Sequence, residues 1–251
     1  MLEILILSAT QGITEFLPVS STAHLILLSE ILNYKNENLT IDISLHLGSL
    51  IAVIFFFKKE IINFIENKSL FFKILIGALP TLIVGFLIVK INLIEFMRNV
   101  YVISFTTIFF GLLLYFADRS VIKKNNINDF SLKDSIYIGL IQCLSLIPGV
   151  SRSGITITGA RFLNFDRIQS AKIAFLFSIP TLIAVSAYGV LKLIELKNLN
   201  VTVHNLEAII FAFIFSLITL KIFIKYIKKF SLFIFVIYRI VLGLLIFAYV
   251  Y

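Results

Sequence analysis

The sequence is dominated by long apolar runs that are separated by short links rich in lysine and arginine. About 20 apolar residues in an α-helix cross the roughly 30 Å hydrocarbon core of a bilayer, so each long run is a candidate span. Hydrophobic residues make up 59% of the chain and charged residues only 14%, as expected for a polytopic membrane protein. We predict an all-α fold with about six transmembrane helices, near residues 41–57, 71–91, 100–117, 171–191, 206–224 and 232–250.

The basic links constrain how these spans are oriented. The net charge of +8 could suggest nucleic acid, but the lysines and arginines sit in short loops, where positive-inside sorting explains them and no nucleic-acid partner is needed. All six spans are accommodated when the links at residues 58–73, 119–133, 161–172 and 225–229 lie inside. Residues 135–160 then start and finish inside, which predicts a re-entrant hairpin. Residues 2–32 precede an outer link at 33–40, which predicts a second hairpin that enters from the opposite face.

Two hairpins that enter from opposite faces indicate an inverted-topology repeat, with the tips meeting inside the membrane. We divide the single membrane domain, residues 1–251, into repeats at 1–117 and 118–251. Each tip has a proline followed by serines, Pro18 and Pro148, and the similar words LPTLIVG and IPTLIAV recur at residues 79–85 and 179–185. Irregular backbone at membrane depth is tolerated only inside protein or beside a wet cavity, so the tips are predicted to define a cavity.

Two other features narrow the possibilities. The N-terminus carries Glu3 and lacks the basic start and cleavage site of a secretory signal peptide, so we expect the first segment to be retained. Cys143 is the single cysteine, which excludes an internal disulfide and a cysteine metal cluster.

The first tip, QGITEFLPVSSTAH at residues 11–24, is unusually polar for this chain. Gln11 and Glu15 are four residues apart and share one face of a helix. One interpretation is a polar pair that holds two helices together. The other is that Glu15 is a general base or a ligand for a hard divalent cation, to which Gln11 would add a neutral oxygen.

The hydroxyl run that follows Pro18 also has two interpretations. One of Ser20, Ser21 and Thr22 is expected to cap the next helix, and capping needs a single hydroxyl. His24 lies within reach of both serines on a helical face, so a serine nucleophile with a histidine partner is geometrically possible. His24 is alternatively the nucleophile itself, the acid for the leaving group, or a structural histidine.

The second tip, PGVSRSGITIT at residues 148–158, surrounds Arg152 with small and hydroxylated residues. Backbone amides, hydroxyls and a guanidinium can converge there on an anion. The alternative is an arginine paired with a carboxylate to hold the hairpin. Thr156 and Thr158 extend the polar face. His46 is interpreted either as a cavity residue or as packing, and His204 as a solvated residue of a polar link.

These segments resemble the bacterial undecaprenyl-diphosphate phosphatase family, also called bacitracin resistance proteins. The resemblance rests on both tips, on LHLGS at residues 45–49 and on KIFIKYIKK and FVIYRIVLG near the C-terminus. It implies a bacterial cytoplasmic-membrane enzyme that removes the terminal phosphate of undecaprenyl diphosphate at the outer side, with Mg²⁺ or Ca²⁺ as a cofactor. The implied partners are the isoprenoid diphosphate lipid and the bilayer, with a homodimer among the open assembly states.

The resemblance also implies roles for individual residues. The catalytic positions are Glu15, Ser21, His24 and Arg152. The metal positions are Glu15 and Gln11, where Gln11 takes a place at which the family has Glu or Gln. The substrate-binding positions around the phosphates are Ser20, Thr22, Gly149, Ser151, Ser153, Gly154 and Thr156.

Two other classes of protein share parts of this pattern. SSTAH and SRSG resemble two pieces of the type 2 phosphatidic acid phosphatase signature, but that signature also needs an Arg-Pro element, and the sequence contains no Arg-Pro dipeptide. A lipid-carrier flippase or transporter is compatible with an inverted repeat of broken helices. Hydrolysis by the purified protein separates that class from an enzyme.

Overall fold

The computed structural model describes residues 2–31, 39–63, 68–91, 93, 97, 99–195 and 202–250. Within these ranges the chain is helical, and the one β feature is an isolated bridge between Lys124 and Phe165. The all-α prediction is therefore confirmed. The elements are α1 (Leu2–Thr14), α2 (Ser21–Ile31), α3 (Leu39–Phe56), α4 (Lys58–Asn63), α5 (Lys68–Lys90), α7 (Val100–Asp118), η1 (Ile127–Asp129), α8 (Leu132–Gln142), η2 (Cys143–Leu146), α9 (Arg152–Phe162), α10 (Arg167–Glu195), α11 (Val203–Ile227) and α12 (Phe233–Val250).

Five helices in the described part of the chain are long and apolar enough to cross a membrane, namely α3, α5, α7, α10 and α11. Each coincides with one of the predicted runs, so the protein is a multi-pass membrane protein. The sixth run forms α12, whose apolar stretch Phe233–Ala248 is shorter than the other five. The outer link predicted at residues 33–40 lies outside the described residues except for Leu39 and Thr40, which begin α3.

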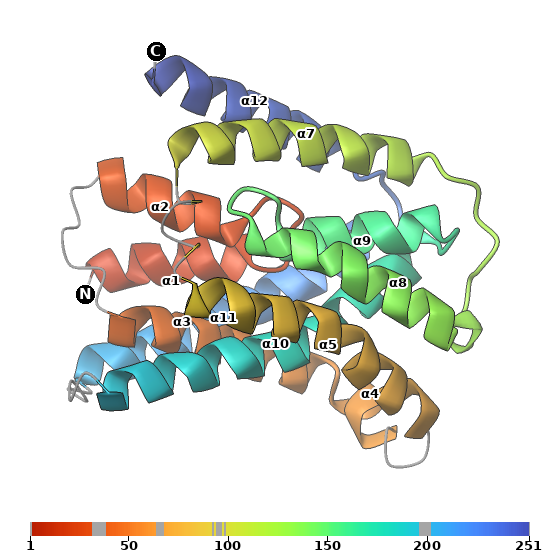
Figure 1. Ribbon diagram of the computed structural model, residues 1–251, viewed down its shortest axis with the longest axis horizontal. Coiled ribbons are helices and arrows are strands. Elements are labelled where there is room, and N and C mark those ends of the chain that lie inside the picture. The colour runs from red at the N-terminus through yellow and green to blue at the C-terminus, as the bar shows by residue number, and fades with distance from the viewer. Residues whose placement is uncertain are drawn as a thin grey trace.

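Two helical hairpins occupy the centre of the molecule. α1 has 13 residues and α2 has 11, and α8 and α9 have 11 each. At 1.5 Å per residue the longest of them extends only about 20 Å, which is too short to cross a bilayer. In Figure 1 the two hairpins point in opposite directions and their tips meet between the long helices. Entry from opposite membrane faces, and the two-repeat division, stay predictions.

The second hairpin is longer than its predicted range of 135–160. Its first helix begins at Leu132, because Ser131 and Asp134 form a capping box. Asp134 N–H donates to Ser131 Oγ at 3.1 Å, and Ser131 N–H donates to the Asp134 carboxylate at 2.9 Å. Burial alone would raise the pKa of Asp134, but hydrogen bonds from Lys124 and Ser131 hold it below its usual value.

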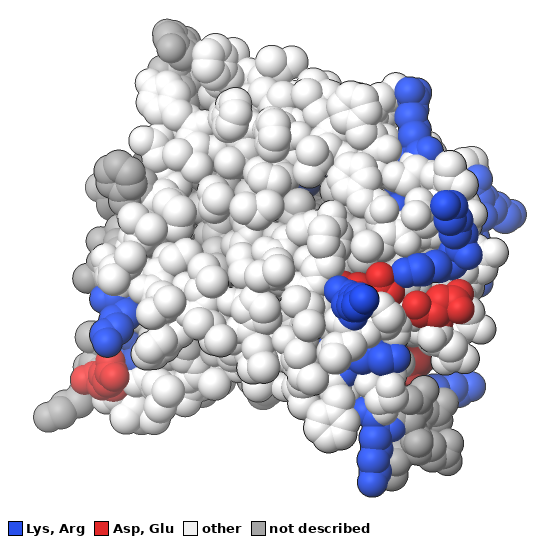
Figure 2. All heavy atoms as spheres, turned by 45° about the vertical axis from the view of Figure 1, so that its right-hand side comes forward, with Lys and Arg blue, Asp and Glu red and all other residues white. Residues whose placement is uncertain are grey.

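Basic side chains gather at one end of the molecule. Figure 2 shows lysine and arginine side chains concentrated at the end where α3, α7 and α11 finish. The links that follow these helices include the exposed residues Lys58, Arg119 and Lys228. At this end Asp118, the last residue of α7, joins α7 to α10, because Arg167 at the start of α10 donates to both of its carboxylate oxygens at 2.7 and 3.0 Å. The arrangement agrees with the prediction that the basic links face the same side.

Small residues let the helices around the first hairpin approach closely. A Cβ at Gly12 of α1 would lie 2.8 Å from the backbone nitrogen of Ser216 in α11, and a Cβ at Gly48 of α3 would lie 2.8 Å from Ala212 Cβ. The Ser216 hydroxyl donates to the Ser49 hydroxyl at 3.0 Å between α11 and α3. Such small and hydroxylated interfaces are typical of helix packing in membranes. They hold α1, and with it Glu15, against the long helices.

Gly139 of α8 provides a test of this packing. A Cβ at this position would collide with the carbonyl oxygen of Gly77 in α5. We expect Gly139→Ala to lower the thermal unfolding midpoint of the purified protein in detergent, because overpacking costs about 1–3 kcal/mol. Gly159→Ala on α9 is the matched control, since its new methyl would contact Ile141 at 3.5 and 3.6 Å, an ordinary distance. Equal midpoints for the two variants would contradict this account.

Candidate active site

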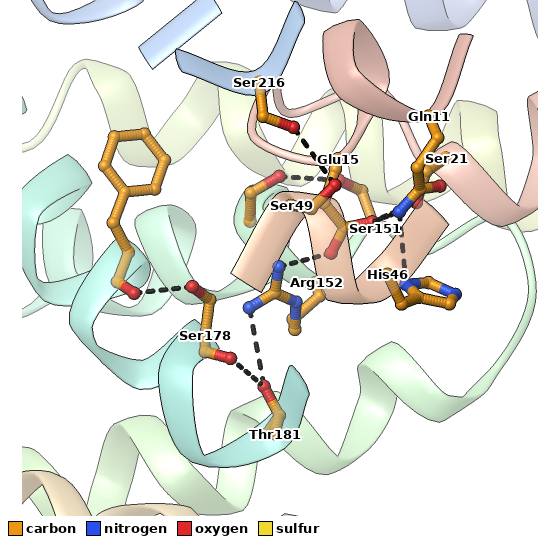
Figure 3. A network of polar contacts seen from close by, with 12 residues as sticks. Gln11, Glu15, Ser21, His46, Ser49, Ser151, Arg152, Ser178, Thr181 and Ser216 are labelled. Carbon is orange, nitrogen blue, oxygen red and sulfur yellow. Dashed lines mark hydrogen bonds and ion pairs between the residues drawn. The ribbon is translucent and has the colours of Figure 1, made fainter. Parts of the chain in front are cut away.

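The two hairpin tips are joined directly by side chains. Arg152 Nη2, at the start of α9, donates to Glu15 Oε1, which directly follows α1, at 2.5 Å. Ser153 Oγ donates to the carbonyl oxygen of Leu17 at 2.7 Å. Figure 3 shows Arg152 lying between Glu15 on one side and Thr181 of α10 on the other. Residues separated by 137 positions in the sequence therefore meet in one buried site.

Each tip contains a serine with a positive φ. Ser20 has a φ of 77° and Ser151 has a φ of 72°, and each directly precedes a helix. Ser20 Oγ accepts from Ala23 N–H at 3.4 Å, which confirms the cap predicted for the first tip. Ser151 Oγ caps the second helix in the same way, since it accepts from Gly154 N–H at 3.1 Å. A non-glycine residue in this region costs about 1–3 kcal/mol and persists only where the surroundings enforce it.

Glu15 is the centre of the polar network. Its side chain is buried, and its Oε2 accepts from Ser21 Oγ at 2.6 Å and from Gln11 Nε2 at 3.1 Å. The shared helical face of Gln11 and Glu15 is therefore confirmed. With Arg152 on Oε1, the carboxylate is charge-balanced. Because the Ser21 hydroxyl donates to it, the carboxylate is placed to accept the Ser21 proton.

A pocket of about 300 Å³ opens at this network. Four of the predicted substrate-binding residues, Ser20, Thr22, Gly149 and Ser151, are among its lining residues, together with Glu15, Ser21 and Arg152. Its other lining residues are His46, Thr81, Ser145, Leu146, Ile147, Pro148, Thr181, Leu182 and Val185.

The structure places three of the predicted substrate-binding residues outside the pocket lining. The Ser153 hydroxyl donates to the carbonyl oxygen of Leu17, as described above. Thr156 Oγ1 donates to the carbonyl of Arg152 at 2.8 Å, one turn back along α9. Gly154 donates its N–H to the Ser151 cap. These residues shape the tip through contacts within the protein.

His24 does not pair with Ser21 in this structure. Its Nδ1–H donates to the carbonyl of Ser20 at 2.6 Å, and its Nε2 accepts from the hydroxyl of Tyr238 in α12 at 2.5 Å. The rings of His24 and Tyr238 are stacked, with centroids 5.7 Å apart. Both ring nitrogens are therefore engaged, and His24 is not among the residues that line the pocket. The geometric possibility of a Ser21–His24 pair is replaced by the Ser21–Glu15 hydrogen bond.

His46 is the histidine that lines the pocket. Gln11 Nε2 lies 3.1 Å from His46 Nδ1, and because an amide NH₂ can only donate, Nδ1 accepts and the ring proton is assigned to Nε2. The cavity interpretation of His46 is thus the one the structure supports. His204 is an exposed residue whose Nδ1 lies 2.9 Å from a Glu207 carboxylate oxygen.

Two pocket threonines were missed by the sequence analysis. Thr81 of α5 and Thr181 of α10 each follow the proline in the similar words LPT and IPT. The hydroxyl of Thr181 accepts from Arg152 Nη1 at 3.4 Å. The repeated LPT and IPT motifs could have identified the two threonines as equivalent positions. The sequence did not indicate that both side chains line one pocket.

Hard divalent cations such as Mg²⁺ and Ca²⁺ are held by oxygen donors. Among the described residues, no group of three or more His, Cys, Asp or Glu side chains could hold a metal. Gln11 Oε1 is buried without a hydrogen-bond partner, in the side chain that contacts Glu15. Mg²⁺ commonly binds through one or two carboxylates, waters and substrate phosphates. The residues fit a cation shared with a phosphate substrate and do not form an all-protein metal cage.

The structure thus defines a polytopic membrane protein with a buried carboxylate–guanidinium pair at the junction of two short hairpins, at the wall of a pocket. The chain belongs to the family described as Bacitracin resistance protein BacA, whose pattern matches residues 4–245. It is 43% identical to the undecaprenyl-diphosphatase of Pelagibacter ubique, with 100% of this chain and 98% of the relative covered. Similar proteins of the same name in Saccharophagus degradans and Roseobacter denitrificans are 40% and 38% identical, with 100% of this chain and 98% and 99% of the relatives covered.

Proposed function

We propose that this protein is an undecaprenyl-diphosphate phosphatase. It removes the terminal phosphate of the C55 isoprenoid diphosphate lipid, which yields undecaprenyl phosphate and inorganic phosphate for recycling of the cell-wall carrier. This activity is associated with bacitracin resistance. The observation that carries the proposal is the contact of Arg152 and Ser21 with one buried carboxylate, Glu15, at the wall of a pocket.

Phosphoryl transfer depends mainly on positioning and on stabilising spread negative charge. Arg152, with the hydroxyls and backbone of the tips, holds the diphosphate. Ser21 Oγ attacks the terminal phosphorus while Glu15 accepts its proton. A bond forms between Ser21 Oγ and phosphorus as the bond to the bridging oxygen breaks, and undecaprenyl phosphate leaves. Water then cleaves the phosphoserine and releases phosphate.

His24 and water are the alternative nucleophiles. Rapid quenching of the enzyme with substrate labelled in the terminal phosphate, followed by peptide mapping, distinguishes the three. Label on Ser21 supports the scheme above. Label on a histidine assigns the attack to His24, and full turnover without any labelled residue assigns it to water.

The proposed cofactor is a divalent cation, Mg²⁺ or Ca²⁺, held by Glu15 and Gln11. It would supply further charge neutralisation to the phosphates. Gln11 brings a buried oxygen that has no hydrogen-bond partner, but this oxygen is neutral. The protein itself therefore offers the cation one carboxylate, which is already paired with Arg152, and one neutral oxygen.

Gln11→Glu tests the metal position. A second carboxylate beside Glu15 attracts a cation more strongly, so we expect Mg²⁺ or Ca²⁺ to bind more tightly. Calorimetric titration of the purified protein with each cation measures this without reference to activity. Glu207→Gln is the control, because this half-buried carboxylate pairs with His204 and does not line the pocket, and it is expected to bind as the wild type does. Unchanged binding in Gln11→Glu would remove this residue from the metal shell.

The proposed location is the bacterial cytoplasmic membrane, with the basic end inside and the pocket reached from the outer side. Thr22 lines the pocket and is exposed, so it can report on access. In a Cys143→Ser background, Thr22→Cys should react with a membrane-impermeant maleimide in intact cells or spheroplasts. Reaction only after the inner side is opened would reverse the orientation.

A homodimer is the assembly proposed for the protein in the membrane.

A lipid flippase is the second candidate, because two short hairpins that meet between long helices are also found in transporters. Phosphate release decides between the two functions. The purified wild-type chain in detergent is given undecaprenyl diphosphate, and inorganic phosphate is measured. Catalytic release supports the phosphatase, whereas binding of the lipid without hydrolysis supports a carrier.

A further inference from the structure

Arg239 is a fully buried arginine in the apolar run of α12. Among the residues that the structure describes, no carboxylate forms an ion pair with it. Its guanidinium instead donates to four backbone carbonyls. Two belong to α7, Thr107 at 3.1 Å and Thr106 at 3.5 Å, and two belong to the hairpin tips, Gly149 at 2.9 Å and Pro18 at 3.4 Å.

The surroundings leave space for this side chain. A Cβ at Gly154, within the second tip, would lie 2.9 Å from Arg239 Nη1. A Cβ at Gly111, in α7, would lie 3.1 Å from Arg239 Cβ. Glycine at both positions therefore permits α12 to place a guanidinium between α7 and the tips. The same helix reaches the first tip a second time through Tyr238, which donates to His24.

A buried charge without a counterion is costly unless dipoles surround it. The tips can supply such dipoles because their chain is not helical, which leaves carbonyls at Pro18 and Gly149 without helical partners. Arg239 is fully hydrogen-bonded only when both tips occupy their observed places. Its interaction energy consequently favours one relative position of the tips.

Pro18 lies three residues after Glu15, and Gly149 lies three residues before Arg152. We propose that Arg239 is a positioning residue which sets the first tip, with Glu15 and Ser21, against the second tip, with Arg152. Arg239 does not line the pocket and so acts through the tips. This inference rests on the proposed phosphatase function, which it extends by a residue outside both motifs.

Arg161 offers a comparison with a buried arginine that, unlike Arg239, also has a carboxylate nearby, since its Nε lies 3.9 Å from Asp118 Oδ1. It is also fully buried and donates to backbone carbonyls, including those of Asp118 at 2.9 Å and Ser120 at 2.8 Å. These carbonyls lie at the last residue of α7 and just after it, at the basic end and away from the tips. If Arg239 has a purely structural role, Arg161→Lys and Arg239→Lys should change kcat by similar factors. A positioning role predicts a loss of turnover specific to Arg239.

The experiment compares Arg239→Lys and Arg161→Lys as purified full-length proteins in detergent. Lysine keeps the charge but lacks the planar fork that reaches several acceptors. Since a 1 Å misplacement can cost about 100-fold in rate, we expect Arg239→Lys to lower kcat by about that factor, with a much smaller change in KM. Arg161→Lys is expected to lower the unfolding midpoint and to keep kcat within about threefold of the wild type.

Double variants with Ser153→Ala measure whether the effects of Arg239 and Ser153 on kcat depend on each other. Ser153→Ala removes the direct hydrogen bond between the tips, so its effect on kcat should depend on whether Arg239 is present. With Arg161→Lys the two effects on kcat should simply multiply, because the sites share no contact. Should Arg239→Lys fail to fold, Gly111→Ala displaces Arg239 from the α7 side. It is expected to lower kcat in the same direction by a smaller factor, with Gly159→Ala as its control.

The outcomes separate the two levels of inference. A wild type that binds the lipid but releases no phosphate overturns the proposed function itself. An active wild type, with Arg239→Lys or Gly111→Ala at normal kcat, overturns the positioning role and leaves the function intact. Equal losses of kcat in Arg239→Lys and Arg161→Lys also overturn the positioning role.

Discussion

Arg152→Ala is expected to reduce phosphate release by at least about 10³-fold, the range found when an arginine that stabilises a transferring phosphoryl group is lost. Arg152 lies in the pocket wall with one Nη on Glu15 and the other on Thr181. Alanine removes both the anion clamp and the partner of Glu15. Initial rates of phosphate release from undecaprenyl diphosphate, measured at saturating lipid, test this expectation.

Loss of stability must be separated from loss of chemistry in this variant. Removing one partner of a buried ion pair typically costs about 3–5 kcal/mol, because the other charge is left uncompensated. We therefore expect Arg152→Ala to lower the unfolding midpoint, and the double variant Arg152→Ala with Glu15→Gln to recover part of it without recovering turnover. Lys124→Ala breaks the Lys124–Asp134 pair, 2.8 Å long, at the basic end and should leave kcat unchanged. Near-normal turnover in a folded Arg152→Ala protein would exclude the clamp role.

Glu15→Gln is expected to lower kcat by about 10²- to 10⁴-fold, the usual contribution of a positioned general base. The change keeps the shape of the side chain but removes the charge that accepts the Ser21 hydroxyl proton. It also leaves Arg152 without its carboxylate, so substrate affinity should fall less than kcat or even rise. The measurement is a full kcat and KM determination beside an unfolding curve.

Ser20→Ala is the matched comparison for Glu15→Gln. Ser20 lines the same pocket, and its hydroxyl serves as a helix cap. Its loss should cost stability of about 0.5–2 kcal/mol. A Glu15→Gln variant that keeps kcat within a few-fold of the wild type would remove Glu15 from proton transfer and leave it a purely structural partner of Arg152.

Much of the fold follows from the periodicity and length of the apolar runs. A run of about 20 apolar residues has few alternatives to a spanning helix, because every backbone polar group must be satisfied within the segment. This is why the five long helices coincide with predicted spans. The two short hairpins were predicted from the positions of the basic links and from runs too short to cross. Their boundaries were less accurate, since the Ser131 capping box extends the second one by a turn.

The candidate site was predictable in its membership more than in its contacts. Spacing of three or four along a helix identified Gln11 with Glu15 and suggested Ser21 with His24. The first pair is observed, whereas His24 turns to Ser20 and to Tyr238, 214 residues away. Spacing defines which residues share a helical face. It does not determine which of several hydrogen-bond partners a side chain reaches when those partners come from another helix.

Taken by itself, the sequence determined that this chain is a polytopic α-helical membrane protein with two polar tips, because burial of backbone and charge in an apolar medium permits few alternatives. Only the tertiary structure decided that Ser21 pairs with Glu15, that His46 lines the pocket and that Arg239 joins both tips. These contacts link segments up to 221 residues apart. They depend on how the helices pack against one another, which local spacing and composition do not specify.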